Sequence, residues 1–499
     1  MSVMTKPRLL YPLLALLTIT TAFLASGCLW GFVRDADTDA GLAGVTVSYT
    51  DANGNTDSTT TNANGWYAFD VASGPIPAVG SATFHLSAPG YESLTTTRSI
   101  QYNDNPGATL ANLSSFWEIQ SFELASEAAA GVIDTAALAL SFPVGVVYDK
   151  DGNLYFSERG PCRVRKVDAG TGAISTVAGT GVCGFSGDGG APASAQLNAP
   201  SGLALDRHGD LFITDTANCR IRKVDFGSNT ITTVAGNGTC GFTGDGGPAT
   251  SAQLMLSDVA MVPSIFVWSD IALDTHGNLY IADIFNCRVR KVDAGGTITT
   301  IAGSGATGFP CGAFSGDGGP ATTARLNGPI AIAVDDGGDV YIAEMGNCRI
   351  RVVDSGSGTI QTIAGDGTCT SSGDGGSALS AGLANPRGLA MDAEGDLYLS
   401  ELRFVITGSP TPMDCSVRRV DMSTGIIDTI AGSGTCGFSG DGDAATDAEI
   451  NTPADIALSC DGNLAFAEPL NGRLRVVYGV SSGGPAPDTD HDGLGYICE

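Results

Sequence analysis

Carboxylates and arginines recur together along the second half of this chain. An acid ends an apolar run in each of six sequence repeats: Glu158, Asp215, Asp283, Glu344, Glu401 and Glu468. Two arginines, two positions apart, follow most of these acids: Arg163 and Arg165, Arg220 and Arg222, Arg288 and Arg290, Arg349 and Arg351, and Arg473 and Arg475, whereas the fifth repeat has Ser416 and Arg418. Residues two apart in a strand share one face, so we expect internal acid–arginine pairs. A ring of six acids at the mouth of a channel would instead trap cations.

Thirteen cysteines form a second pattern. Ten of them fall in pairs within the repeats at nearly constant spacing: Cys162 with Cys183, Cys219 with Cys240, Cys287 with Cys311, Cys348 with Cys369, and Cys415 with Cys436. The first cysteine opens the third expected strand of its repeat and the second follows the fourth, so the hairpin brings them together. We predict five disulfides within repeats and a sixth between Cys460 and Cys498. Zinc is the alternative, but the four histidines do not recur beside the cysteine pairs.

Oxygen-bearing residues follow calcium-binding spacing in residues 488–499. The expected ligands are Asp488, Asp490, Asp492, the Leu494 carbonyl and Glu499. No helical pattern flanks this loop, and a cysteine precedes its last acid, so it resembles a single thrombospondin type 3 calcium repeat more than an EF-hand. The resemblance implies weak binding of extracellular calcium, the only cofactor we expect. An acidic, solvated tail is the alternative.

Short β-strands must position these residues. The six repeats align on Asp149, Asp206, Asp274, Asp335, Asp392 and Ser459, and each contains four runs of strand type. Six repeats of four strands predict a closed β-propeller, which protects its sheet edges. Insertions near residues 259–268 and 403–413 interrupt the period. Because a binding site normally breaks the symmetry of a repeat, these insertions are where we look first for a recognition surface.

Residues 215–224, DTANCRIRKV, resemble the NHL repeat, and the resemblance extends over roughly residues 130–480. It implies an NHL-type six-bladed propeller but no single function, because the family includes adhesion and scaffold modules, sensor ectodomains and a few lyases. The glycine-rich segments, such as residues 241–247, contain an acid that would repel phosphate and lack the lysine of a phosphate loop. We interpret them as linkers between blades.

The N-terminus predicts export. Lys6 and Arg8 precede an apolar run, residues 9–24, that is too short and wrongly flanked for a membrane span. The following residues, ASGC at 25–28, resemble a bacterial lipobox, which implies a lipid anchor on Cys28. Plain secretion with an ordinary Cys28 thiol is the alternative. The net charge of -28 disfavours nucleic acid and acidic membrane surfaces as partners, so the anchor is the only membrane contact we expect.

Residues 29–94 have the pattern of strands and tight turns. The alternating segment 44–49, a hairpin signal at 62–65 and a strand that starts at Trp66 predict a small antiparallel β-sandwich. The segments that carry a family resemblance are GFVRD (31–35), GLAGV (41–45), NGWY (64–67) and APGY (88–91). Together they resemble the carboxypeptidase regulatory-like family, a transthyretin-like sandwich. The resemblance implies a stalk or adhesive spacer and no peptidase activity.

No residue set typical of catalysis is evident. His208 and His276 fall in the same hairpin turn of their repeats, so we interpret them as turn residues. We find no nucleophile elbow, no zinc motif and no pair of carboxylates that departs from the repeat. The sequence therefore predicts no catalysis. A metal-dependent enzyme with its site in the central channel, similar to propeller lactonases or lyases, is the alternative, and a purely structural envelope component is the third hypothesis.

These observations predict an all-β protein: a six-bladed NHL-type β-propeller preceded by a small antiparallel β-sandwich. We expect a lipoprotein signal peptide (1–27), the sandwich (28–115), the propeller (125–480) and a flexible acidic tail (481–499), and we assign no structure to residues 95–130. The predicted function is an exported, lipid-anchored binding or scaffold protein of the bacterial cell envelope or cell surface, with plain secretion as the second choice. Its propeller would present loops to a protein or glycan ligand.

Overall fold

The computed structural model of the chain divides into two compact parts, Met1–Glu118 and Ile119–Glu499. It describes residues 131–256, 267–305, 311–312, 314–403 and 414–481 in full, and only the backbone of eight strands before residue 101. Residues 10–27 of the expected signal peptide, most of both insertions, the calcium-type tail and Cys498 lie outside the described residues. Within the described part, no helix is long and apolar enough to cross a membrane.

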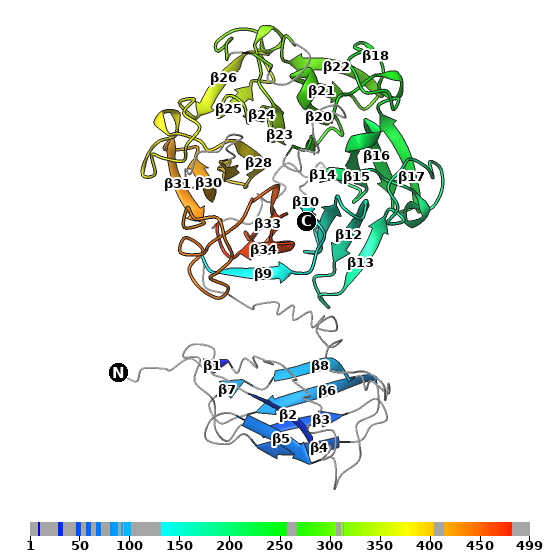
Figure 1. The fold of residues 1–499 in the computed structure, drawn as a ribbon, viewed down its shortest axis with the longest axis vertical. Coiled ribbons are helices and arrows are strands. Elements are labelled where there is room, and N and C mark those ends of the chain that lie inside the picture. Colours follow the sequence, from blue (N-terminus) through cyan, green and yellow to red (C-terminus); the bar gives the residue numbers. More distant parts are fainter. Residues whose placement is uncertain are drawn as a thin grey trace. The chain divides into compact units, whose positions relative to one another are not determined.

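Antiparallel strands form two sheets in the first part (Figure 1). One has the order β4–β3–β6–β8, the other pairs β2 with β5, and β1 pairs with β7 in parallel. The bounds are β1 Arg8–Leu9, β2 Cys28–Phe32, β3 Thr46–Thr50, β4 Thr56–Thr60, β5 Trp66–Asp70, β6 Gly80–Ser87, β7 Tyr91–Glu92 and β8 Leu94–Ile100. The predicted hairpin at residues 62–65 is wrong, because the flanking strands β4 and β5 belong to different sheets. A turn signal shows where the chain reverses but not which sheet receives the next strand.

Six sheets surround a common axis in the second part, as Figure 1 shows. The first strand of each blade contacts the first strands of its two neighbours, and the last of them, β32, contacts β10. The inner strands therefore close into a ring, and this part is the predicted six-bladed propeller. They are β10 Pro143–Tyr148, β14 Pro200–Leu205, β19 Ile271–Leu273, β23 Pro329–Val334, β28 Pro386–Met391 and β32 Ile456–Leu458.

Each blade continues outward from its inner strand in chain order. The second strands are β11 Leu154–Glu158, β15 Leu211–Asp215, β20 Leu279–Asp283, β24 Val340–Glu344, β29 Leu397–Leu402 and β33 Leu464–Glu468. The third strands are β12 Arg163–Val167, β16 Arg220–Asp225, β21 Arg288–Val292, β25 Arg349–Val353, β30 Cys415–Asp421 and β34 Arg473–Val477. Outside them lie β13 Ile174–Ala178, β17 Thr230–Ala235, β22 Thr297–Ala302, β26 Ile360–Ala364 and β31 Ile426–Ala431. We call the face where inner strands begin and second strands end the front face.

Packing between blades explains why these sequences form strands. The second strands are buried along their whole length, as in all five residues of β20. Their central position carries a fully buried apolar side chain in every blade: Phe156, Ile213, Ile281, Ile342, Leu399 and Phe466. Because each blade packs against two neighbours, its middle strands need apolar side chains on both faces.

The ring closes with a strand from the N-terminal end of the propeller. We expected four strands from each repeat, but the sixth repeat supplies three of the four strands in its blade. The outermost strand is β9, Ile133–Ala137, which pairs antiparallel with β34 so that Val477 lies opposite Ile133. A signal was present in the sequence, because IDTAA at 133–137 is similar to fourth strands such as ITTVA at 231–235.

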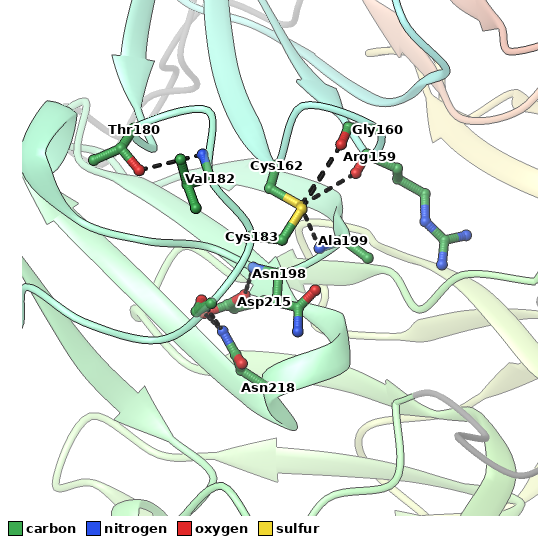
Figure 2. The surroundings of a disulfide bond; sticks show 11 residues. Arg159, Gly160, Cys162, Thr180, Val182, Cys183, Asn198, Ala199, Asp215 and Asn218 are labelled. Atoms are coloured by element: carbon green, nitrogen blue, oxygen red, sulfur yellow. Dashed lines mark hydrogen bonds between the residues drawn. A yellow bond between two sulfur atoms is a disulfide. The ribbon is translucent and has the colours of Figure 1, made fainter.

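Five disulfides fasten the propeller loops: Cys162–Cys183, Cys219–Cys240, Cys287–Cys311, Cys348–Cys369 and Cys415–Cys436. These are the five pairs that the spacing predicts, so these ten cysteines do not bind zinc. The first of them is drawn in Figure 2. Cys460 is also disulfide-bonded, but its predicted partner Cys498 lies outside the described residues.

Candidate functional site

The six repeated acids lie between the second and third strands of their blades. Asp283 is completely buried, pairs across the sheet with Arg288, and lies 3.2 Å from Nη1 of Arg290 through its Oδ2 atom. The same contact to the second arginine recurs in Arg222–Asp215, Arg351–Glu344 and Arg418–Glu401. None of the six acids lines the channel cavity described below. The predicted acid–arginine pairing is confirmed in these blades, and the acids form no cation-trapping ring.

Burial dominates the electrostatics of these acids. Loss of hydration raises the pKa of Asp283, although bonds from Asn286, the Met255 N–H and Arg290 act in the opposite direction. Desolvation also raises the pKa of Asp215, Glu344 and Glu401, and it raises the pKa of Glu468 to about 7. Figure 2 shows how Asp215 accepts bonds from the Asn198 N–H and the Asn218 amide beside the first disulfide. These carboxylates are therefore engaged in holding loops and strands together.

The glycine-rich linkers do more than connect blades. Each has a six-residue core, which we call a clasp loop: residues 185–190, 242–247, 314–319, 371–376 and 438–443. The clasp-loop aspartate binds the second arginine of the next blade: Asp188–Arg222 at 2.7 Å, Asp245–Arg290 at 2.8 Å, Asp317–Arg351 at 2.6 Å, Asp374–Arg418 at 2.5 Å and Asp441–Arg475 at 2.7 Å. All five arginines are completely buried. The linker interpretation therefore holds, but it missed that the loop supplies a charge to the junction.

An aromatic ring and a glycine backbone complete the clasp. The guanidinium carbon of Arg288 lies 3.8 Å from the ring centroid of Phe242. The same stacking joins Arg220 to Phe185, Arg349 to Phe314 and Arg473 to Phe438. The backbone of Gly246 donates a hydrogen bond to the Ile298 carbonyl at 2.8 Å, so the loop extends the outer edge of the next blade. Short fifth strands form in this way at β18 Gly247–Pro248 and β27 Gly376–Ser377.

Short 3-10 helices accompany these loops. Those in the linkers are η2 Pro192–Ser194, η4 Ala249–Ser251, η6 Ala321–Thr323 and η7 Ala378–Ser380. Those after second strands are η3 Thr216–Asn218 and η5 Ile284–Asn286. In all four linker helices the first or second residue is a buried alanine or proline, which seats the linker against its own blade.

One junction replaces both members of the aromatic pair at once. Ser371 stands where the other clasp loops have phenylalanine, and Ser416 stands where the other blades have the first arginine. Both hydroxyls donate to Oε2 of Glu401, at 2.7 Å and 3.1 Å. The exchange keeps the buried acid satisfied, which indicates that the phenylalanine and the first arginine act as one structural pair.

A cavity of about 230 Å³ lies along the inner strands of the ring. Two of its lining residues, Asp270 and Asp455, directly precede β19 and β32 in opposite blades of the ring. The other four blades carry small residues at this position: Gly145, Gly202, Ala331 and Gly388. A Cβ atom on Gly202 would lie 2.6 Å from the Asp270 carboxylate, so the neighbour of this aspartate has to be glycine. The pair therefore departs from the sixfold repeat.

Each of these aspartates bridges two blades. The Ile332 N–H donates to Oδ2 of Asp270 at 3.2 Å, and the Val146 N–H donates to Oδ2 of Asp455 at 3.0 Å. Burial raises the pKa of Asp270 to about 7. Burial first, and then the charge on Asp270, raise the pKa of Asp455 well above its usual value. The fold therefore favours the protonated form of both carboxyls.

The expectation that no pair of carboxylates departs from the repeat is therefore wrong. The residues that align the six repeats, five aspartates and Ser459, directly follow the inner strands, whereas Asp270 and Asp455 directly precede theirs. The position four residues before these alignment residues reads Gly, Gly, Asp, Ala, Gly, Asp around the ring. The replacement of a small residue by an aspartate in two of the six blades is visible in the sequence and indicates this pair.

A second group of non-repeating residues lies at the front end of the inner strands. Trp268 occupies a position that is proline in the other five blades, and its side chain is buried. The guanidinium carbon of Arg387 lies 5.0 Å from the Trp268 ring centroid, and Nη1 of Arg159 donates to the Val267 carbonyl at 3.0 Å. Burial lowers the pKa of Arg387 to about 9 and that of Arg159 to about 10. This group flanks the undescribed insertion at 257–266.

The described residues do not fit a metal centre. No group of three or more His, Cys, Asp or Glu side chains in that part of the chain could hold an ion. Asp270 and Asp455 supply two carboxyls that already accept backbone bonds, whereas calcium takes about six to eight oxygen ligands. His208 is exposed beside Asp206, and the His276 N–H donates to Asp274, so both histidines lie in hairpin turns as expected. The five predicted calcium ligands of the tail lie outside the described residues.

Family models match both parts of the chain. The carboxypeptidase regulatory-like domain matches residues 29–112, and the NHL repeat matches residues 197–224 and 326–353. The chain therefore contains a domain of the first kind and NHL repeats in its propeller, as the sequence motifs indicated.

Matches to individual proteins are partial. The protein SUPPRESSOR OF QUENCHING 1, chloroplastic, of Arabidopsis thaliana is 39% identical over 90 residues, which is 18% of this chain and 8% of that protein. Human teneurin-1 is 28% identical over 229 residues, or 34% of this chain and 8% of teneurin-1. The chain thus spans less than a tenth of the length of these relatives. Among solved structures, an auxiliary nutrient binding protein of Bacteroides thetaiotaomicron has a TM-score of 0.47 at 13% identity, covering 90% of this chain and 93% of that one.

Proposed function

We propose that this chain is an exported, lipid-anchored binding protein whose propeller recognises a protein or glycan at its front face. The observation that carries the proposal is the separation of repeated from non-repeated residues. The repeated acids, arginines and aromatic rings are used in blade junctions. The non-repeated Trp268, Arg159 and Arg387 gather at the front end of the ring, beside the root of one insertion.

Both insertions start and end on fixed structure. The two residues that flank the second insertion are bonded to each other. The Arg403 N–H donates to the Asp414 carbonyl at 3.0 Å, and their side chains form an ion pair at 4.0 Å. At the other insertion, the Ser269 hydroxyl donates to the Leu256 carbonyl at 3.2 Å. Loops held by a rigid scaffold are a common means of recognition in β-propellers and other β-proteins. Export is supported by the disulfides, which persist in oxidising compartments.

Replacing residues 257–266 and 404–413 by short Gly-Ser linkers tests the front face. Both the wild-type chain and the variant are immobilised and exposed to cell-envelope proteins and to a glycan array. The variant should keep its thermal unfolding temperature and lose capture of the ligand. A variant that is equally stable and still captures the same ligand would overturn the proposal. In a separate test, Cys28→Ser should move the protein from the membrane fraction to the soluble fraction, and unchanged partitioning would refute the lipid anchor.

A second candidate function is a metal-dependent enzyme with its site in the channel. It is favoured by one observation, the non-repeating pair Asp270 and Asp455 in the cavity wall. Elemental analysis of the chain truncated after residue 481 tests this candidate without interference from the tail. Stoichiometric metal that disappears in Asp270→Asn would favour the enzyme, and a metal-free protein would count against it. The tail itself is proposed to bind calcium weakly, which calorimetric titration of full-length and truncated chains would measure.

A further inference from the structure

The outer edge of a blade is covered in five of the six blades. In the second blade, the Ile231 N–H donates to the Gly190 carbonyl at 3.0 Å and the Gly189 N–H donates to the Ile231 carbonyl at 2.8 Å. The equivalent isoleucines in the following blades, Ile298, Ile360, Ile427 and Ile133, also accept an N–H from the preceding clasp loop. All five isoleucines are completely buried. The clasp loops therefore act as short covering strands for blades 2 to 6.

The first blade has no such cover among the described residues. Its outermost strand, β13, is the last in the order β10–β11–β12–β13, and its Ile174 is only half-buried. The connection that precedes this blade, residues 138–142, is too short to contain a clasp loop. The β13 edge thus presents the Ile174 N–H and carbonyl, which lie in the same register as those of Ile231. Unpaired strand edges of this kind readily accept another strand.

The first blade nevertheless keeps the side chains that receive a clasp. Thr176 is exposed and corresponds to threonines whose hydroxyls donate to clasp-loop aspartates at 2.7 Å: Thr233, Thr300, Thr362 and Thr135. Arg163 and Arg165 of β12 occupy the two arginine positions, and both contact Glu158, at 2.6 Å and 3.8 Å. These arginines lie on β12, one strand inside the edge, and their positive charge favours a carboxylate beside Thr176.

We propose that β13 is a docking edge for an extended, acidic, glycine-containing segment of another polypeptide, which adds to the first blade as the clasp loops add to the others. The five internal junctions define the chemistry of the partner. Two backbone groups bind Ile174, and a carboxylate accepts a bond from the Thr176 hydroxyl. Addition of a strand to a free sheet edge is a common mode of peptide recognition. This edge is distinct from the front face, so either proposal can fail alone.

A peptide with the sequence of residues 241–253, GFTGDGGPATSAQ, is a direct probe, because it reproduces one clasp loop. Fluorescence anisotropy with the full chain should detect saturable binding, and a peptide with asparagine in place of its aspartate should bind at least severalfold more weakly. Thr176→Val should weaken binding by about three- to tenfold. Thr233→Val, in a blade that is already covered, is the matched control and should leave the affinity unchanged. Absence of binding, or equal losses in the two variants, would overturn the proposal.

Hydrogen exchange distinguishes a separate partner from cover by the chain itself. In the free protein the Ile174 amide should exchange at least a hundredfold faster than the Ile231 amide, and the peptide should slow it. If the Ile174 amide is as protected as that of Ile231 in the absence of peptide, another segment of this chain occupies the edge, and the proposal of a separate partner is wrong.

Discussion

The five clasped junctions and the seam between the sixth and first blades hold the propeller together in different ways. At a clasped junction, buried charges add to the backbone bonds of the clasp loop: Arg290 binds Asp283 of its own blade and Asp245 of the preceding clasp loop. At the seam, backbone pairing makes the connection, because β9 pairs with β34 and the chain then passes directly into β10. The repeated acid–arginine contacts therefore join blades that are neighbours in sequence, whereas strand pairing joins the two ends of the propeller segment.

The largest expected effect comes from removing a clasped arginine. Arg290→Met should lower the free energy of unfolding by about 3–5 kcal/mol, because it leaves Asp283 buried without its charged partner. Guanidinium denaturation followed by tryptophan fluorescence measures the change. Arg165→Met in the first blade is the matched control and should cost less than half as much, since Arg163 still binds Glu158 at 2.6 Å. Equal costs would mean that clasped and unclasped blades do not differ.

The next effect concerns the disulfides, which fix the start of each linker next to its own blade. Replacing Cys219 and Cys240 together by serine opens a loop with a sequence separation of 21. The expected cost is about 3 kcal/mol in the chain-entropy account. The sixth repeat has Gly472 at the position of the first cysteine and so lacks this constraint. A double variant that unfolds at the same denaturant concentration as the wild type would show that the clasp alone holds the linker.

Each channel aspartate accepts a backbone hydrogen bond from a neighbouring blade. Asp270 does so across the third junction, which is clasped, and Asp455 does so across the seam. The pKa of Asp270 is raised from 3.8 to about 7, so the fold favours its protonated form. That contribution to stability is complete below about pH 4 and is lost as the pH rises through 7. Asp270→Asn should therefore exceed the wild type in stability by on the order of 1–2 kcal/mol at pH 8 and show no gain at pH 4.

Thermal unfolding between pH 4 and pH 8 measures this difference. A gain that is the same at both ends of the range would show that the change acts through packing and not through charge. Asp455→Asn makes the same comparison across the seam.

The smallest effect comes from converting the fourth junction to the common pattern. Ser371→Phe and Ser416→Arg should each destabilise the protein alone, because each removes a bond to Glu401. Together they restore the stacked pair seen in the other clasps, so we expect a favourable coupling of about 1 kcal/mol. A double-mutant cycle in urea provides the value. Additive losses would contradict the view that phenylalanine and arginine act as one pair.

Much of the fold was predictable because the same sequence pattern occurs six times. The strand order, the five disulfide pairs and the acid–arginine contacts all follow from period-two alternation and constant spacing. The partners supplied by the next blade, such as Asp245 for Arg290, were not, because a single strand pattern contains no information on contacts between sheets. The same limit explains the error at residues 62–65, because a turn signal does not specify which sheet receives the next strand.

The candidate site was harder to predict than the scaffold. Repetition draws attention to residues that recur, such as Glu344, and these are structural. Trp268 occurs once in its position, Asp270 shares its position only with Asp455, and both Trp268 and Asp270 follow an insertion that shifts the alignment. Their burial and their contacts across the ring depend on the closure of all six blades, which no local pattern describes. Comparison of the six repeats column by column, including positions just outside the strands, is the sequence test that finds them.

Closure by β9 means that the propeller cannot be completed until its last strand has been synthesised. This strand is the first of the propeller to leave the ribosome, and its partner β34 is the last. Until β34 emerges, β9 remains a strand without its neighbour, and every intermediate has an open ring with exposed edges. Such long-range pairing slows folding and exposes intermediates to aggregation. Until the final strand arrives, the clasps are contacts that hold finished neighbouring blades together.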